Sequence, residues 1–281
     1  GEGDTTIVSG DLDAPVFRIL DSQRITVRRI SIDHDPLGYT QGTITGVDVA
    51  KLTCEVTIDP GYPAPNEPRF KGAQVHPFVF PEKAYYQLDR HWPNPVEMVR
   101  TGERTWKWKL QGPSHLDNWP GKRFFLYTES RSHAFILSHL RDTTLEDIRY
   151  WGGGANAGFY VNGLEGLTTF RRFVIGAPTG SDRLYACAGG GQVSGLRGKL
   201  LLDRCDFSRI DDDGLDILSN YTRILGQKDA RTLVVQAKNS DYRPGDRVEL
   251  WDWRHKRKRA EALITAAQGQ PGGTFLITLD R

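Results

Sequence analysis

The chain has 281 residues and a formal net charge of +2, with 37 basic and 35 acidic residues. That balance argues against nucleic acid and against an anionic membrane surface as partners. No apolar run reaches the ~20 residues of a membrane span. Three widely spaced cysteines make neither a disulfide framework nor a Cys-x-x-Cys metal site, so we expect no cofactor and no resident metal.

Four segments share an apolar template with apolar or Cys residues at the first, fourth and sixth positions. They begin at Val27, Leu145, Phe170 and Leu202. Ten residues before these lie Phe17, Phe135, Tyr160 and Gln192. Such self-similarity, with branched or aromatic interiors and Gly, Asn and Asp at the corners, is typical of stacked short strands. The pattern predicts an all-β fold: a right-handed parallel β-helix with inserted antiparallel β-barrel or sandwich domains.

In chain order, the pattern predicts four parts. Residues 1–33 form N-terminal rungs of the β-helix, and residues 36–130 form an inserted barrel or sandwich, because they alternate apolar and polar residues between Pro-rich turns. The rungs return over 131–228, and four strand-like runs over 229–281 predict a second small barrel. We expect further rungs to follow in the parent protein, because a β-helix ending here would leave an uncapped edge.

Aromatic and basic side chains are concentrated in the two insertions. Those of the first either fill the barrel core, which we favour, or face a glycan: Tyr85, Tyr86, Trp92, Trp106, Trp108 and Trp119. In the second insertion, the basic run Arg254 to Arg259 is more typical of a solvated hairpin tip than of a site for an anionic partner.

Polar corner segments follow the template in each rung. They begin at Asp33, Trp151, Gly176 and Ser208, and the last ends in Asp211-Asp212-Asp213. Because equivalent corners stack, we expect these segments to line one edge of the solenoid as a binding groove. Three adjacent carboxylates repel one another, so such a triplet either binds a cation, keeps one carboxyl protonated for acid–base chemistry, or is a solvated acidic turn.

With these residues in view, the chain resembles glycoside hydrolase family 110, the α-1,3-galactosidases that act on terminal galactose of blood-group-B-like glycans. The resemblance runs over essentially the whole chain and is carried by Ile32 to Pro36, Tyr39 to Ile44, Gly158-Phe159, and Cys205-x-Phe207 followed by Asp212-Asp213-Gly214. It implies a bacterial, exo-acting, inverting enzyme that is secreted, periplasmic or on the cell surface. A homodimer is one oligomeric state that the sequence leaves open.

The family's adjacent aspartate pair corresponds to Asp212 and Asp213, which the resemblance assigns as the catalytic residues. Inverting hydrolysis uses one carboxylic acid and one carboxylate, ~6.5–9.5 Å apart. The candidate substrate-binding residues are Asp33, His34, Asp35, Trp151, Asn156, Asp182, Arg183, Gln192, Asp211 and Asp216.

The chain departs from the family at four positions. Gly189 stands where the family has a further catalytic aspartate, Gln192 and Leu218 stand in place of histidines, and Asn162 stands in place of a glutamate. Losing a catalytic carboxylate lowers a rate by several orders of magnitude.

Three functions therefore stay open, each with a carbohydrate as partner. The expected one is hydrolysis of terminal α-linked galactose in glycans or galactose-containing polysaccharides. The second is a polysaccharide lyase or another carbohydrate-active β-helix enzyme, in which the acids hold a divalent cation. The third is a catalytically impaired relative that binds glycans without turnover.

Overall fold

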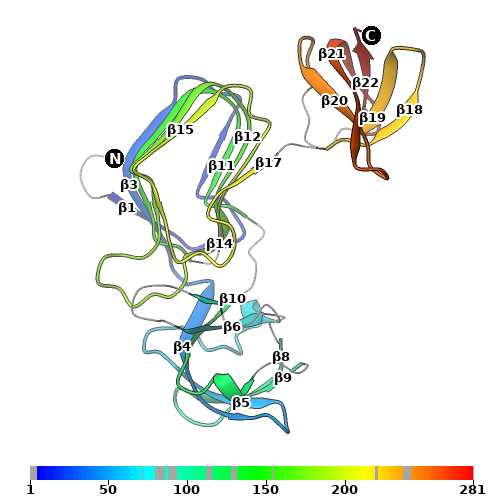
Figure 1. The fold of residues 1–281 in the computed structure, drawn as a ribbon. Coiled ribbons are helices and arrows are strands. Elements are labelled where there is room, and N and C mark those ends of the chain that lie inside the picture. The colour runs from blue at the N-terminus through cyan, green and yellow to red at the C-terminus, as the bar shows by residue number, and fades with distance from the viewer. Residues whose placement is uncertain are drawn as a thin grey trace. The chain divides into compact units, whose positions relative to one another are not determined.

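The computed structural model describes residues 5–71, 73–79, 86–87, 94–111, 116–127, 132–153, 155–218, 221–236 and 242–280. The predicted all-β class is confirmed: the strands form a ten-stranded parallel sheet and two antiparallel sheets of seven and five strands (Figure 1). The chain divides into two compact units, Gly1–Gln192 with Gly198–Asp216, and Val193–Arg197 with Ile217–Arg281. Within the described residues, no helix is long and apolar enough to span a membrane.

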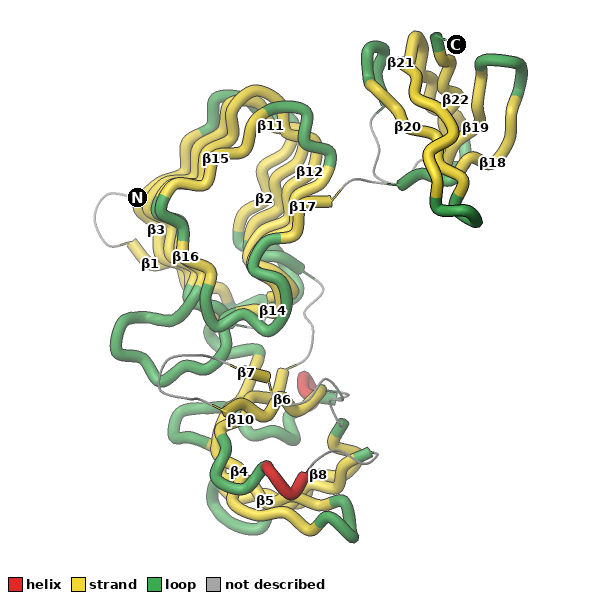
Figure 2. The backbone as a smooth tube through the Cα atoms, viewed as in Figure 1, coloured by secondary structure: helices red, strands yellow, loops and turns green. Residues whose placement is uncertain are grey.

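The parallel sheet is built from segments that are far apart in the sequence (Figure 2). Its strands are β1 (Thr5–Ser9), β2 (Phe17–Leu20), β3 (Thr26–His34), β11 (Phe135–Tyr150), β12 (Ala155–Arg171), β13 (Val174–Ile175), β14 (Cys187–Ser194), β15 (Lys199–Asp203), β16 (Asp206–Phe207) and β17 (Asp216–Leu218). We call the successive stretches that pair in it layers: 17–34, 135–150, 155–175 and 187–207.

The apolar template predicted from the sequence sets the register between layers, and this prediction is confirmed. Residues at equivalent template positions are strand partners, in two rows: Val27, Leu145, Phe170 and Leu202, and Ile32, Tyr150, Ile175 and Phe207. Because a shift of one residue turns every side chain to the opposite face, the buried residues specify this pairing strongly.

The prediction that Tyr160 occupies the position of Phe135 is wrong by one residue. Phe135 is the partner of Phe17 on one side and of Phe159 on the other. Strand β12 contains one residue more than β11 over this stretch, in a bulge that includes Gly166, whose φ is +64°. A bulge leaves one extra residue unpaired, so counting back ten residues from Phe170 stops one residue short of the true partner.

The layers bend at residues with a left-handed backbone. One row of bends consists of Arg29, Asp147, Arg172 and Arg204, with φ between 48° and 55°. A second row contains Asp21 and His139 together with Gly163. Left-handed backbone is unfavourable for residues other than glycine, and Asp tolerates it better than most. The stacked layers therefore hold Arg and His at these bends against their local preference.

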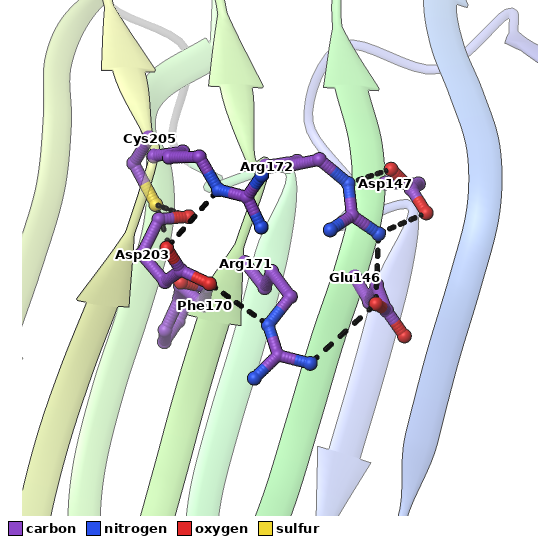
Figure 3. Close-up of polar contacts among 8 residues, drawn as sticks. Glu146, Asp147, Phe170, Arg171, Arg172, Asp203 and Cys205 are labelled. Carbon is purple, nitrogen blue, oxygen red and sulfur yellow. Dashed lines mark hydrogen bonds and ion pairs between the residues drawn. The ribbon is translucent and has the colours of Figure 1, made fainter.

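Opposite charges connect neighbouring layers beside the first row of bends (Figure 3). Arg172 Nη2 lies 2.8 Å from Glu146 Oε1 and also donates to Asp147 Oδ2 at 2.7 Å. Arg171 Nε donates to Asp203 Oδ2 at 3.0 Å, and the Cys205 thiol lies 3.3 Å from the Phe170 carbonyl oxygen. Cys205 is half-buried, as is Ile30 at the same template position, whereas Ile148 and Phe173 are fully buried there. Exposed ion pairs of this kind contribute at most about 1 kcal/mol each.

Phenylalanine side chains fill the interior of the layers. Phe135, Phe159, Phe170 and Phe173 are fully buried, and the rings of Phe159 and Phe170 lie 4.6 Å apart. Burial of one such side chain contributes about 1.5–3 kcal/mol. These rings therefore contribute a large share of the hydrophobic stabilisation of the parallel sheet, together with buried aliphatic residues such as Leu145 and Ile148.

Replacing Phe159 by Ala should lower the free energy of unfolding by about 3–5 kcal/mol, because truncation leaves a cavity. The Phe159 ring contacts Phe170 and Phe173 of its own layer and Phe207 of the next layer. Urea unfolding followed by tryptophan fluorescence measures the change. Leu201→Ala is the matched control, because Leu201 is 43% exposed in the same sheet. Equal destabilisation by the two substitutions would contradict this account of the core.

The seven-stranded antiparallel sheet consists of β4 (Tyr39–Asp48), β5 (Thr53–Ile58), β6 (Gln74–Val79), β7 (Tyr86–Gln87), β8 (Pro95–Arg100), β9 (Thr105–Leu110) and β10 (Arg123–Tyr127), with short 3-10 helices at Pro68–Phe70 and Leu116–Asn118. Trp106, Trp108 and Trp119 are buried in its core, at most 4% exposed. For these three the core interpretation is confirmed. Tyr85 and Trp92 lie outside the described residues, and of Tyr86 only the backbone is described.

The second unit contains the five-stranded antiparallel sheet: β18 (Ile224–Gln227), β19 (Thr232–Gln236), β20 (Arg247–Asp252), β21 (Arg257–Gln270) and β22 (Thr274–Leu279). Its core is small and consists of Val235, Ala262, Ile264, Ile277 and Leu279. The β20–β21 hairpin extends from this core and carries the basic run at its tip.

Candidate functional site

The corner segments stack as predicted. Backbone hydrogen bonds join the first residue of each corner to the layer beside it, from Trp151 N to Ile32 O (2.9 Å), from Gly176 N to Tyr150 O (3.0 Å), and from Ser208 N to Ile175 O (2.9 Å). These bonds bring segments from distant parts of the chain to one edge of the parallel sheet.

The acidic triplet lies directly on the segment 187–190. Asp212 N donates to Ala188 O at 2.8 Å, and Gly190 N donates to Asp213 O at 2.9 Å. This approach requires glycine at position 190, because a Cβ there would lie 2.0 Å from the carbonyl oxygen of Gly214. Gly190 therefore fixes the acidic turn against the neighbouring strand.

A cavity of about 230 Å³ opens at this place. It is lined by Tyr127, His133, Asn156, Ala157, Ala188, Gly189, Gly191, Gln192, Asp211, Asp212, Asp213 and Asp216. The structure thus brings six of the predicted site residues together: the four aspartates, Asn156 and Gln192. Gly189, at the position where the resemblance to glycoside hydrolase family 110 predicts an aspartate, lines the same cavity.

Negative charge is concentrated around Asp212. Although its side chain remains exposed, partial burial raises the pKa of Asp212 above its ordinary value, and the charges of Asp213, Asp211 and Asp216 raise this pKa further. Neighbouring carboxylates disfavour ionisation of one another. Asp212 therefore keeps its proton to a higher pH than an ordinary aspartate does.

Asp211 has a different environment from its two neighbours. It is half-buried, and its Oδ2 accepts a hydrogen bond from Tyr127 Oη at 3.0 Å. The Tyr127 ring stacks on the buried ring of Tyr185, with centroids 4.5 Å apart. Asp211 thus anchors the acidic turn to strand β10, while Asp212 and Asp213 remain exposed at the cavity.

Two polar residues that line the cavity, Tyr127 and His133, are not identified by the sequence analysis. Tyr127 belongs to the antiparallel sheet and reaches the cavity through the tertiary structure alone, so no local pattern could identify it. His133 comes just before strand β11, and burial lowers the pKa of its imidazole, which favours the neutral form at pH 7. A neutral imidazole can both accept and donate hydrogen bonds to a ligand.

Asp33, Arg183, Trp151 and Asp182 are not among the cavity-lining residues. Arg183 forms a bidentate ion pair with Asp33, with N–O distances of 2.7 and 3.0 Å, and also donates to the Trp151 carbonyl oxygen at 3.3 Å. Asp182 accepts a hydrogen bond from Tyr62 Oη at 3.3 Å. Gln41 Nε2 of β4 also donates to the Asp182 carbonyl oxygen at 3.1 Å, which joins the antiparallel sheet to this segment. A role for these residues in substrate binding stays a prediction.

His34 and Asp35 do not line the cavity either. His34 is 5% exposed, and its Nε2 lies 3.4 Å from Tyr150 Oη. Burial lowers the pKa of His34 despite the charge of Asp33 beside it. Asp35 is exposed, and its backbone N–H donates to Ser9 O at 3.0 Å. Substrate contact by these two side chains likewise stays a prediction.

Comparison with known proteins adds no family assignment: no family model matches the chain, and a search of curated proteins found no significant match. The resemblance to glycoside hydrolase family 110 therefore rests on the residues quoted above. Within the described ranges, no group of three or more His, Cys, Asp or Glu side chains is arranged to hold a metal ion. The lining aspartates, Asn156 and Gln192 make the cavity acidic and rich in amide groups, which can exchange protons and bind hydroxyl groups.

Proposed function

We propose that the parallel sheet winds as a right-handed parallel β-helix into which the two antiparallel sheets are inserted. Three features support this: one template repeated in register, rows of left-handed bends at equivalent positions, and a strand β11 that pairs with β2 and β3 on one side and with β12 and β13 on the other. Parallel connections within one sheet are right-handed in nearly all proteins.

We propose that the chain is a glycoside hydrolase that releases terminal α-linked galactose with inversion of configuration. The observation that carries this proposal is the cavity in which Asp212, with its raised pKa, lies beside Asp213 and two further aspartates. The small volume of about 230 Å³ suits one sugar residue better than a length of polysaccharide, which favours exo action.

The residues then divide the work of an inverting mechanism. Asp212 in its acid form donates a proton to the glycosidic oxygen. Asp213 as a carboxylate takes a proton from the water that attacks the anomeric carbon from the opposite face. The amides of Asn156 and Gln192 offer both donors and acceptors to sugar hydroxyls.

Glycan binding without turnover is the second candidate, and one observation favours it. Gly189 leaves the cavity without the carboxylate that the related family has at this position. With that group absent, the remaining aspartates and amides still provide hydrogen-bond partners for a sugar.

Incubation with a panel of α- and β-linked galactosides and galactose-containing polysaccharides tests the proposal. Proton NMR of the reaction should show the β-anomer of galactose appearing first from an α-linked substrate. Release of the α-anomer first would contradict inversion. An unsaturated product that absorbs in the ultraviolet would identify a lyase, and saturable sugar binding with no product would identify the binding protein.

Asp211→Asn should move the alkaline limb of the pH–rate profile to lower pH. The acid form of Asp212 is populated below its raised pKa and is lost as the pH rises through it, so activity falls on that side. Removing the Asp211 charge removes one cause of the raised pKa. The Asn oxygen can still accept the bond from Tyr127 Oη. Profiles of kcat/KM measure the shift; a limb that stays in place would show that Asp212 is not the titrating acid.

A further inference from the structure

The tip of the β20–β21 hairpin exposes two tryptophans beside a basic run. Trp253 is 81% exposed and Trp251 is 48% exposed. Large aromatic side chains in water usually mark an interaction surface when polar groups surround them. Here residues 253–260 are all exposed, and six of them, Arg254 to Arg259, are Arg, His or Lys.

An internal network holds the tip in one conformation. The half-buried Asp252 carboxylate accepts hydrogen bonds from the backbone N–H of His255 at 3.2 Å, from its Nδ1 at 2.8 Å, and from Arg259 Nε at 3.1 Å. These bonds lower the pKa of Asp252 to about 2, so it is ionised at any physiological pH. A loop that is already ordered loses less entropy when it binds a ligand.

Some cations of the tip are neutralised and others are available. Lys258 Nζ lies 3.0 Å from Glu249 and 3.1 Å from Glu261, and Arg259 pairs with Asp252. Among the residues that the structure describes, Arg254, Lys256 and Arg257 have no ion-pair partner. Residues 217–281 contain 12 Lys and Arg against 7 Asp and Glu, although the whole chain is nearly neutral.

We propose that this tip binds an acidic polysaccharide. Sulfate or uronate groups pair with Arg254, Lys256 and Arg257, and sugar rings pack on Trp251 and Trp253. Charge complementarity selects an anionic partner, and exposed indole faces select one with flat apolar surfaces. Nucleic acid shares both properties, since bases also stack on aromatic rings; the choice of a polysaccharide rests on the proposed carbohydrate function. The tip would hold the enzyme on a charged glycan while the cavity acts on chain ends.

Electrophoresis of the full chain through gels containing dextran sulfate, polygalacturonate or neutral galactomannan tests this proposal. We expect retardation by the two acidic polymers and none by galactomannan. Trp253→Ala should weaken retardation about fivefold to tenfold. The triple substitution Arg254→Ser, Lys256→Ser and Arg257→Ser should abolish it, and salt should weaken the parent's binding. Arg223→Ser, which removes an exposed cation outside the hairpin, is the matched control and should change nothing.

Unchanged thermal unfolding confirms that the tip variants fold, since every substituted side chain is exposed. Equal retardation of the parent and the tip variants, or no retardation of the parent, would overturn the proposal. Tip-dependent binding of poly(dT) that is tighter than binding of both acidic polymers would reassign the surface to nucleic acid. Asp212→Asn separates the two proposals, because it should lower the rate of hydrolysis by about a thousandfold and leave retardation as strong as before.

Discussion

Asp212→Asn should lower kcat for release of α-linked galactose by about a thousandfold, because a carboxamide has no acidic proton for the leaving oxygen. The side chain keeps its size, and Asp212 is exposed, so the substitution should leave the fold intact. The loss should be smaller on aryl galactosides with acidic leaving groups, since these depart without full protonation. Initial rates on a natural disaccharide and on a nitrophenyl galactoside measure the difference.

Asp213→Asn should lower the rates on both substrates equally, because activation of water is needed whatever the leaving group. Asp206→Asn is the matched control: Asp206 is exposed, lies in the same part of the parallel sheet and does not line the cavity. Full activity in both Asp212→Asn and Asp213→Asn would remove these residues from the mechanism. Such a result would leave the cavity as a binding site only.

If the proposed hydrolase function holds, Gly189→Asp should raise the rate of hydrolysis by about a hundredfold, because it adds a carboxylate to the cavity at the position where the resemblance to glycoside hydrolase family 110 predicts one. The structure has room for it. A Cβ at position 189 would lie 3.5 Å from Ala157 Cβ and 3.8 Å from Asp213 O, which are ordinary contacts, and the backbone there is outside the left-handed region. The new charge should also raise the pKa of Asp212 further.

Gly189→Asn is the control for this gain, because it adds the same volume without a charge. Gly190→Ala is a contrasting substitution one residue away: its Cβ would meet Gly214 O at 2.0 Å and displace the acidic turn. We expect low activity from both. If folded Gly189→Asp is no faster than Gly189→Asn, the missing aspartate is not what limits this chain. Values of kcat/KM on the best substrate of the panel measure the gain, and unfolding curves show whether each variant is folded.

The parts of the fold that depend on side-chain burial were predictable. Leu145 and Phe170 are strand partners because both are buried in the interior of their layers, and this requirement produces a periodic pattern of apolar residues in the sequence. The bulge in β12 produces no such pattern. Counting residues from Phe170 therefore assigns Tyr160 as the partner of Phe135, whereas the true partner is Phe159. The left-handed bends are equally hidden, because Arg172 at such a bend is held by its layers and not by local preference.

The acidic part of the site was predictable for the same reason as the register. Asp211, Asp212 and Asp213 follow a template, and stacked corners bring them to Asn156. Tyr127 could not be predicted, because its place at the cavity depends on how the antiparallel sheet meets the parallel one. The pairing of Asp33 with Arg183, 150 residues apart, likewise depends on tertiary structure.

The charges beside the first row of bends bear on how the layers find their neighbours during folding. Across consecutive layers, the aligned residues alternate in sign: Arg28, Glu146, Arg171 and Asp203. If a layer were skipped during assembly, arginine would face arginine and carboxylate would face carboxylate. Like charges on opposed strands repel. The apolar residues of the template are so similar between layers that they would pack almost as well against the wrong layer. The four aligned charges therefore favour pairing of each layer with its native neighbour, a choice that hydrophobic packing alone does not make.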